Sequence, residues 1–270
     1  MKKLYFWGNC QFGHLWYLLS NLLSKNEYET LYFSNNARTG NLKETVLIIN
    51  SIKEADILIY QPLGPQHGEL SQVNIKNTLK RSCICIAMEY VFNSGVYSLC
   101  HAPLYKVRDY GKIFGEECII ELVGNKSQKD IIKDYKDGTI DFKLQARFSN
   151  CISQMEEREA RSRTEIKLVD FIKSRYRYEK LFYTHNHPTN VLFREIIRQL
   201  ILLISLPVNM HRLNDIKLKE LNSISSPVSP YDVAMHGYHF KPSSDWLKKG
   251  GKLISLILQN MYKSNADVLS

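Results

Sequence analysis

The first ninety residues alternate between short, continuously apolar runs and longer stretches with helical periodicity. The apolar runs lie at residues 3–7, 29–33, 55–60 and 82–88, and the helical stretches lie at 11–25, 41–53 and 71–80. Strands that are apolar at consecutive positions are typical of a parallel sheet, because helices cover both of its faces. The alternation therefore predicts an α/β fold with a doubly wound parallel sheet and short right-handed crossovers. We expect strand 3–7 in the interior of that sheet.

Beyond residue 90 the pattern is mainly helical. One further strand is predicted at 180–184, and helices are predicted at 127–136, 141–161, 164–177, 189–205 and 244–263. The Ser- and Pro-rich stretch 221–232 is interpreted as a loop. We interpret the 270 residues as a single α/β domain, 1–270, with a charged helical insertion at 125–178 and a C-terminal helix within 240–270.

The chain carries 36 basic and 27 acidic residues, which gives a formal net charge of +9. This excess favours an anionic partner, such as a phosphorylated cofactor or sugar, or a membrane surface. We expect no nucleic-acid partner, because the basic residues are dispersed and no binding motif is legible. The sequence has no GxGxxG and no GxxxxGKS or GxxxxGKT stretch, which removes the usual nucleotide-binding interpretations.

Six cysteines are scattered through the chain, and none forms a Cys-x-x-Cys pair. This usage is typical of reduced thiols in a cytoplasmic protein, and no export signal follows the N-terminal MKK. Cys83 and Cys85 point to the same face of a predicted strand, where a packing role suffices. We expect no metal site. The basic C-terminal helix leaves peripheral attachment to the inner face of a membrane open, although a packed helix is favoured.

Three predicted strands end in polar side chains that simple connections do not require. The first is followed by Gly8-Asn9-Cys10-Gln11, the third by Gln61-Pro62, and the last by Thr184-His185-Asn186-His187-Pro188. Ligand sites of open α/β sheets form beyond the carboxyl ends of the strands. We therefore expect these groups to converge at one edge of the sheet.

Cys10 stands where the predicted helix 11–25 begins. Backbone N–H groups and the helix dipole at that position favour a thiolate and lower the pKa of the thiol. A histidine within hydrogen-bond reach would complete a nucleophile–base pair. Asn9, Gln11 and Gln61 would place amide donors where a tetrahedral oxyanion forms. Cys, Gln and His at three strand ends together favour a catalytic site over three separate packing roles.

Four stretches, in their order along the chain, carry a resemblance to a known family. They are Gly8-Asn9-Cys10-Gln11, ADILIYQPL (55–63), CIAMEYVFNSGVYSL (85–99) and LFYTHNHPTN (181–190). This ordered set resembles the WcbI-type capsular polysaccharide biosynthesis family. The resemblance implies an SGNH-hydrolase or flavodoxin-like fold, coenzyme A (CoA) or acetyl-CoA as co-substrate, and acetyl transfer in the synthesis of a surface glycan.

By this resemblance Cys10 takes the place of the nucleophilic serine of SGNH esterases, and His187 takes that of their catalytic histidine. Those esterases carry Asp three residues before the histidine, and neither His185 nor His187 has an Asp there. We therefore expect a Cys–His dyad, with Asn186 or a backbone carbonyl orienting the ring. Which histidine is the base stays open, and His187 is favoured.

The phosphates of CoA require Arg or Lys near the carboxyl edge of the sheet. The candidate cofactor contacts are Gly8, His14, Arg38, Lys76 and Lys80. The candidate substrate contacts are His185, Asn186, Phe92 and Asn93.

Three functions are compatible with the sequence. The favoured one is a CoA-dependent O-acyltransferase whose acceptor is a glycan or a nucleotide-sugar. The second is a hydrolase, either a thioesterase or a glycan deacetylase, that uses the same Cys–His site. The third is a protein that binds CoA, a nucleotide or a glycan without chemistry, in which Cys10 is a core residue. The acceptor sugar, the acyl group, the oligomeric state and any association with a polysaccharide-synthesis complex stay open.

Overall fold

The computed structural model describes residues 1–35, 42–101, 113–123, 125–212 and 225–268. By its internal contacts the chain forms two compact units. Unit 1 comprises residues 1–91, 155–171 and 190–220, and unit 2 comprises residues 92–154, 172–189 and 221–270. The segment 125–178, expected as an insertion, contributes residues to both units. The interpretation of the whole chain as a single domain stays a prediction.

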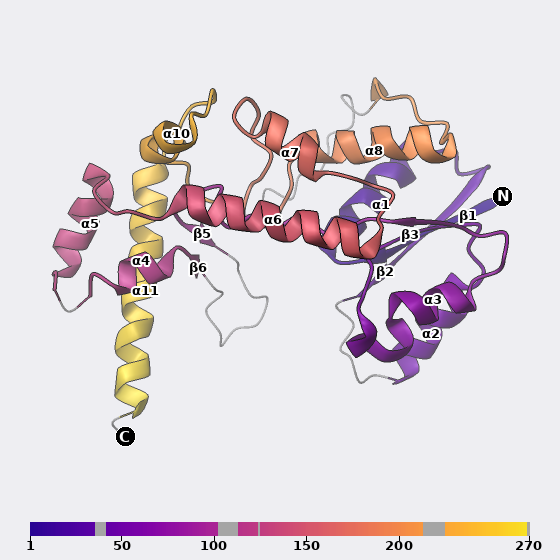
Figure 1. Ribbon diagram of the computed structural model, residues 1–270, viewed down its shortest axis with the longest axis horizontal. Coiled ribbons are helices and arrows are strands. Elements are labelled where there is room, and N and C mark those ends of the chain that lie inside the picture. Colours follow the sequence, from indigo (N-terminus) through magenta and orange to yellow (C-terminus); the bar gives the residue numbers. More distant parts are fainter. Residues whose placement is uncertain (36–41, 102–112, 124, 213–224, 269–270) are drawn as a thin grey trace. The chain divides into compact units, whose positions relative to one another are not determined.

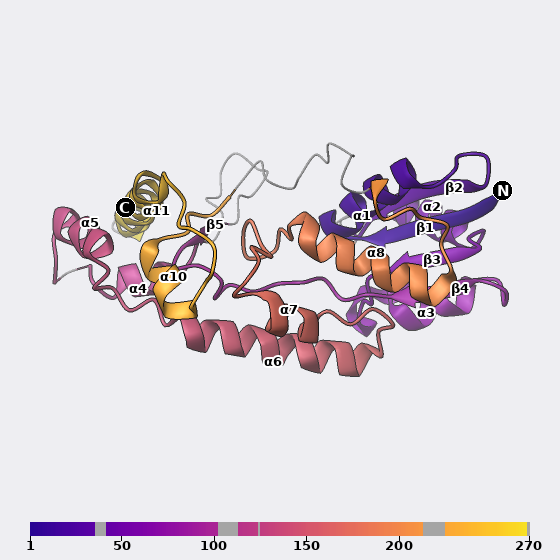
Figure 2. The same cartoon turned by 90° about the horizontal axis from the view of Figure 1, so that it is seen from above.

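Unit 1 is built on a parallel sheet with the strand order β2-β1-β3-β4. Figure 1 labels β1, β2 and β3 of this sheet, and Figure 2 also labels β4. The strands are β1 (Lys2–Gly8), β2 (Tyr28–Ser34), β3 (Ile57–Tyr60) and β4 (Ile84–Ala87). β1 pairs in parallel with β2 on one side and with β3 on the other. The four predicted strands of the first ninety residues and the interior position of strand 3–7 are therefore confirmed. The direction of winding reverses between β1 and β3, which makes this the switch point of the sheet.

Helices cover both faces of this sheet, which Figure 2 shows from a second side. Tyr5 and Trp7 pack on one face with Ile52 and Ile75, which belong to α2 and α3. Leu4 alternates with these strand residues and is fully buried on the opposite face. The helices of unit 1 are α1 (Cys10–Leu22), α2 (Leu42–Ile52), the 3-10 helix η1 (Pro65–Leu70), α3 (Gln72–Thr78) and α8 (Asn190–Ile204).

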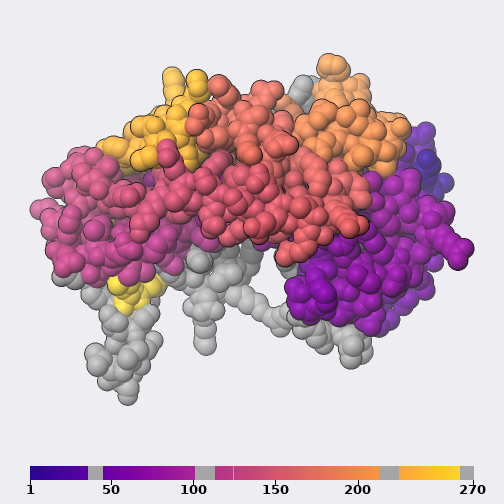
Figure 3. All heavy atoms as spheres, in the orientation of Figure 1, coloured from indigo at the N-terminus to yellow at the C-terminus, as the bar shows by residue number. Residues whose placement is uncertain are grey.

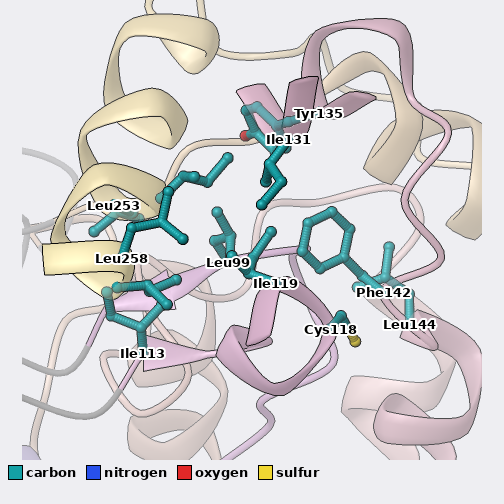
Figure 4. Packing of buried hydrophobic residues seen from close by; sticks show 12 residues of the cluster. Leu99, Ile113, Cys118, Ile119, Ile131, Tyr135, Phe142, Leu144, Leu253 and Leu258 are labelled. Atoms are coloured by element: carbon teal, nitrogen blue, oxygen red, sulfur yellow. The ribbon is translucent and has the colours of Figure 1, made fainter. Parts of the chain in front are cut away.

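Unit 2 contains a short antiparallel strand pair and a mainly helical core. Figure 4 shows this core, in which Leu99 and Ile119 pack with Ile131 of α5 and with Leu253 and Leu258 of α11. The C-terminal helix thus buries its apolar side in unit 2. The elements are β5 (Cys100–His101), β6 (Ile113–Phe114), α4 (Glu116–Ile120), α5 (Gln128–Asp137), α10 (Pro230–His236) and α11 (Trp246–Val268).

Two further helices, α6 (Leu144–Ser162) and α7 (Val169–Arg175), each contribute residues to both units. Every helix predicted from the sequence corresponds to an observed helix, with ends that differ by a few residues. The sequence did not predict the short elements η1, α4, β5, β6 and α10. No helix among the described residues is long and apolar enough to cross a membrane.

The predicted strand 180–184 is wrong. Phe182 forms only an isolated antiparallel bridge with Pro188. Inside that bridge the backbone N–H of Tyr183 donates to the carbonyl of His187 at 2.8 Å. The chain therefore folds back on itself at once, and this local pairing uses backbone groups that a fifth sheet strand would need.

The predicted loop 221–232 is wrong at its carboxyl end, where α10 begins at Pro230. The Ser229 hydroxyl accepts from the Asp232 N–H, and the Asp232 carboxylate accepts from the Ser229 N–H. This reciprocal capping box starts a helix after the Ser- and Pro-rich stretch. Residues 221–224 lie outside the described residues.

Candidate functional site

The carboxyl ends of β1, β2 and β3 are joined by hydrogen bonds in unit 1. The backbone N–H of Asn35 donates to the Gly8 carbonyl at 2.9 Å, and the Asn35 side-chain amide donates to Gln61 Oε1 at 2.8 Å. The Gln61 N–H donates to the Trp7 carbonyl at 2.9 Å. Gly8 ends β1, and Asn35 and Gln61 follow β2 and β3. Residues 184–188 belong to unit 2 and end no strand of this sheet. The expected convergence is therefore confirmed for the first and third predicted strands only. It lies at the switch point, where α/β sheets bind ligands.

The Gly8-Asn9 pair shapes the turn from β1 into α1. A Cβ atom on Gly8 would lie 2.3 Å from the ring of Phe12, so a larger residue does not fit there. Asn9 is the N-cap of α1, and its Oδ1 accepts from the Gln11 N–H at 2.9 Å. Cys10 is then the first residue of the helix. Its exposed side chain lies at the carboxyl edge of the sheet.

The electrostatics of Cys10 differ from the expectation. The surrounding protein removes enough water from this exposed residue to raise the pKa of Cys10 above its ordinary value. The backbone N–H groups of Cys10 and Gln11 lower the pKa, but by less than burial raises it. The expected net lowering by the helix is therefore wrong, and the thiol needs a base to become a nucleophile at neutral pH.

Gln11 does not serve as an oxyanion donor in this arrangement. Its side chain is 2% exposed, its Nε2 donates to the Val91 carbonyl at 2.8 Å, and its Oε1 accepts from the Val91 N–H at 3.0 Å. These two bonds satisfy a buried backbone segment after β4 and tie it to α1. The expected catalytic role of Gln11 is therefore corrected to a structural one.

Tyr32 is a neighbour of Cys10 that was not predicted from the sequence. Its hydroxyl donates to the carbonyls of Gly8 and Asn9, at 3.2 and 3.0 Å, and burial raises its pKa. Its ring covers Gly13, where a Cβ atom would lie 3.0 Å away. The alternation of side chains along β2 could have indicated this neighbour, because it places Tyr32 on the same face as Thr30. Thr30 accepts a hydrogen bond from Trp16 of α1, so that face is the one toward α1.

Three candidate cofactor contacts have other partners. Lys80 Nζ lies 2.6 Å from Asp56 Oδ1, before β3 begins, so Lys80 is at the amino ends of the strands rather than at the carboxyl edge. Its expected role is wrong, because α3 returns the chain to the amino end before β4. Lys76 Nζ lies 5.8 Å from the ring centroid of Tyr60. The ring of His14 is buried against Phe193 of α8, with a centroid distance of 4.6 Å. Arg38 lies outside the described residues.

A pocket of about 880 Å³ opens beside Gln61 in unit 1. The segment after β3 and the carboxyl end of α6 line it, and Figure 3 shows the surfaces of these two parts adjoining. It gathers His67, Tyr90, Arg158 and Arg161 near Gln61. These residues were not predicted from the sequence, because α6 is far from β3 along the chain and no motif links them.

The other candidate residues belong to unit 2. The ring of His185 is buried between Phe92 and Phe114, at centroid distances of 5.2 and 4.5 Å, and its carbonyl accepts from the Asn93 N–H at 2.7 Å. The structure therefore brings together His185, Phe92 and Asn93. His187 is partly exposed, and it lies within the turn that the Phe182 bridge closes.

The Asn93 side chain stabilises the loop in which it lies. Its side chain is fully buried, its Oδ1 accepts from the Gly95 N–H at 2.9 Å, and its Nδ2 donates to the Phe148 carbonyl at 3.3 Å. A Cβ atom on Gly95 would lie 2.1 Å from the backbone nitrogen of Phe148, so the two segments approach closely. These contacts correct the expected role of Asn93 from substrate binding to loop structure. Asn186 Oδ1 accepts from the Thr184 hydroxyl at 3.2 Å.

The fold and the site define an α/β protein whose parallel sheet delivers an exposed cysteine to its switch point. The chain belongs to the WcbI family of polysaccharide biosynthesis enzymes, whose family model matches residues 3–209. The resemblance seen in the sequence is thereby confirmed. No curated protein matches the chain.

One solved structure is similar to this chain, that of WcbI, which is described as a novel polysaccharide biosynthesis enzyme. The TM-score is 0.67 at 17% sequence identity, and the match covers 89% of this chain and 80% of that one. That structure is described as the native protein without a disulfide bond between CoA and one of its cysteines. At this identity the likeness shows a shared fold.

Proposed function

We propose that the chain is a CoA-dependent O-acyltransferase, with acetyl as the acyl group, acting on a sugar of a surface or capsular polysaccharide. The observation that carries the proposal is the exposed Cys10 at the first residue of α1, on the edge that also presents Gln61. Membership of a family of polysaccharide biosynthesis enzymes supports a glycan as the acceptor. The order β2-β1-β3-β4 supports the SGNH-hydrolase or flavodoxin-like form of the fold.

Acetyl-CoA is the proposed donor. The solved WcbI structure is described with reference to CoA and a cysteine, and we propose that Cys10 meets the thioester end of the cofactor here. The site fits this role, because the Cys10 side chain is exposed and Asn35, which is bonded to Gln61, is also bonded to the carbonyl of Gly8, two residues before Cys10. Among the described residues no group of His, Cys, Asp and Glu could hold a metal ion.

The proposed reaction has two steps. In the first, Cys10 Sγ gives up its proton to a base and attacks the thioester carbonyl, so that a new C–S bond forms and CoA leaves with a proton. In the second, a sugar hydroxyl gives up its proton and attacks the acetyl-cysteine, and Cys10 leaves as the thiol. Because burial raises the pKa of Cys10, the base matters for the first step. His187 stays the proposed base.

The side-chain amides near Cys10 have different roles, because some are bonded within the protein and one is left to stabilise an oxyanion. Asn9 Oδ1 is bonded within the protein, and so are Nε2 and Oε1 of Gln11. Gln61 uses its oxygen to accept from Asn35, which leaves its Nε2 as the donor for a tetrahedral oxyanion. We therefore propose Gln61 as the main side-chain donor, with Asn9 as the alternative. Removal of such a donor typically costs about 10²-fold or more in rate.

The test is to incubate the purified protein with acetyl-CoA and to measure its intact mass and its peptides. We expect one added acetyl group, located on the peptide that contains Cys10, and none in the Cys10→Ala variant. Rapid release of free CoA without any sugar would favour the hydrolase. Unchanged acetylation of the Cys10→Ala protein would contradict the proposed nucleophile.

A further inference from the structure

The pocket beside Gln61 offers hydrogen-bonding groups of both kinds. Gln72 Nε2 donates to the Tyr60 hydroxyl at 3.3 Å, and Asn74 Nδ2 donates to the Gly68 carbonyl at 3.0 Å. Their oxygens are thus the atoms left to accept from a ligand. Gln61 has the opposite arrangement, since its oxygen is bonded and its nitrogen is left to donate. Paired donors and acceptors of this kind suit the hydroxyl groups of a sugar.

The same pocket carries an excess of positive charge. The Arg158 guanidinium lies 4.5 Å from the ring centroid of Tyr90, which holds it in place by stacking. Arg161 is exposed, and no ion pair involves it within the described ranges of the chain. The one carboxylate among the lining residues, Glu89, accepts from the Ser162 hydroxyl at 2.6 Å. Two arginines on one turn of α6 therefore suit an anion, and phosphate above all.

The pocket is connected to the reacting edge. Gln61 lines the pocket and is also bonded to Asn35, whose N–H is bonded to the Gly8 carbonyl, two residues before Cys10. A ligand in the pocket would thus approach the edge where Cys10 is exposed.

We propose that this pocket binds the acceptor and that the acceptor is a sugar carrying a phosphate ester. Sugar hydroxyls bind Gln72, Asn74 and one of the two N–H groups of Gln61 Nε2, and the phosphate binds Arg158 and Arg161. The inference rests on the proposed function, because it names the acceptor class of the same reaction. The CoA phosphates fit less well, because the amide oxygens of Gln72 and Asn74 would face phosphate oxygens that also carry only lone pairs.

The experiment measures binding of five probes to the full chain by calorimetry. These are glucose 1-phosphate, glucose 6-phosphate, UDP-glucose, methyl glucoside and CoA. We expect at least one phosphorylated sugar to bind at least tenfold more tightly than methyl glucoside, with an affinity that falls as salt rises. Arg161→Gln should weaken that binding several-fold, and Arg158→Gln combined with Arg161→Gln should weaken it at least tenfold.

Arg163→Gln is the matched control. It removes the same charge two residues from Arg161, but Arg163 does not line the pocket. We expect this control to bind the sugar phosphate as the unchanged protein does, and the arginine variants to bind CoA with unchanged affinity. Arg161 is exposed, so its single variant should fold even if the double variant does not.

Three results would overturn the inference. One is that no phosphorylated sugar of the panel binds, and another is that the arginine variants bind it as well as the control does. The third is that these variants lose CoA while sugar-phosphate binding is unchanged, which would assign the pocket to the donor. Failure of the proposed function is a separate result, because it is read from acetylation of Cys10 rather than from binding to the pocket.

Discussion

Among the cysteines of this chain, the exposure of a thiol does not decide how readily it ionises. Cys10 is exposed, yet burial by its surroundings raises its pKa. Cys85 is only partly exposed, yet its interaction with the Cys83 side chain and the charge of nearby Lys76 lower its pKa. The more exposed thiol is therefore the less ionised one at neutral pH, and reactivity follows the thiolate.

The first prediction concerns alkylation of these thiols. At pH 7 we expect iodoacetamide to label Cys85 before Cys10, as measured by peptide mass spectrometry over time. Because the pKa of Cys10 is raised, its labelling should grow as the pH rises through and beyond the ordinary range of a thiol. Faster labelling of Cys10 at pH 7 would contradict this. Repeating the measurement with His187→Ala would then show whether that histidine is what ionises the thiol.

The second prediction concerns Gly8. Gly8→Ala places a methyl group 2.3 Å from the Phe12 ring, so one of the two segments must shift. Overpacking of this kind typically costs about 1–3 kcal/mol. Gly251→Ala is the matched control, since a Cβ at that helical position would meet nothing within 4 Å beyond its own helix backbone and chain neighbours, and alanine favours helix. Urea unfolding should show a loss for the first variant and no loss for the second.

At the scale of the element, Asn9 caps the start of α1 and is also the alternative candidate for an oxyanion donor. The third prediction separates them with two variants. Asn9→Ala removes the cap and should lower the free energy of unfolding by about 0.5–2 kcal/mol. Asn9→Ser keeps a capping oxygen and removes the amide N–H groups. If Asn9 acts only as the cap, Asn9→Ser should acetylate Cys10 at nearly the unchanged rate, whereas a loss of about 10²-fold would make Asn9 an oxyanion donor.

The elements that the sequence predicts well are those with a long, strong pattern. β1 and β3 are buried on both faces, so their apolar runs are unbroken. The stretch 180–184 also contains a short apolar run, but residues just after it pair back onto it, which no local pattern of apolar residues reveals. α10 escaped prediction because its capping box lies in a stretch otherwise rich in Ser and Pro.

For the site residues too, those placed by the strands were predictable, and those placed by distant contacts were not. Cys10 and Gln61 were predictable, because the carboxyl ends of parallel strands must share an edge. Gln11 was misjudged, since its partner is the backbone of Val91, which is far away in the sequence. Arg158 and Arg161 were missed because tertiary packing alone brings a helix of one region to the loop of another. Sequence thus places the edge that carries Cys10 and Gln61 but not the side chains that surround it.

At the scale of the whole molecule, the proposed chemistry joins residues that are distant in the sequence. The fourth prediction is that His187→Ala lowers acetylation of the protein by acetyl-CoA almost to the level that remains in Cys10→Ala, because a nucleophile and its base fail as a unit. His185→Ala should retain much more acetylation but should lower stability, since its ring is buried between Phe92 and Phe114. Equal losses for both histidine variants would leave the choice of base unsupported.

The net charge of +9 belongs to the whole chain and predicts how the donor binds. CoA carries several phosphate charges, and attraction between exposed charges weakens as salt shortens the screening length to about 8 Å at physiological ionic strength. The fifth prediction is that the Kd of acetyl-CoA rises steadily with sodium chloride. Acetyl-pantetheine is the control, because it has the same thioester arm without the phosphates. It should acetylate Cys10 at a rate that salt does not change. A donor affinity independent of salt would mean that the basic surface takes no part in CoA binding.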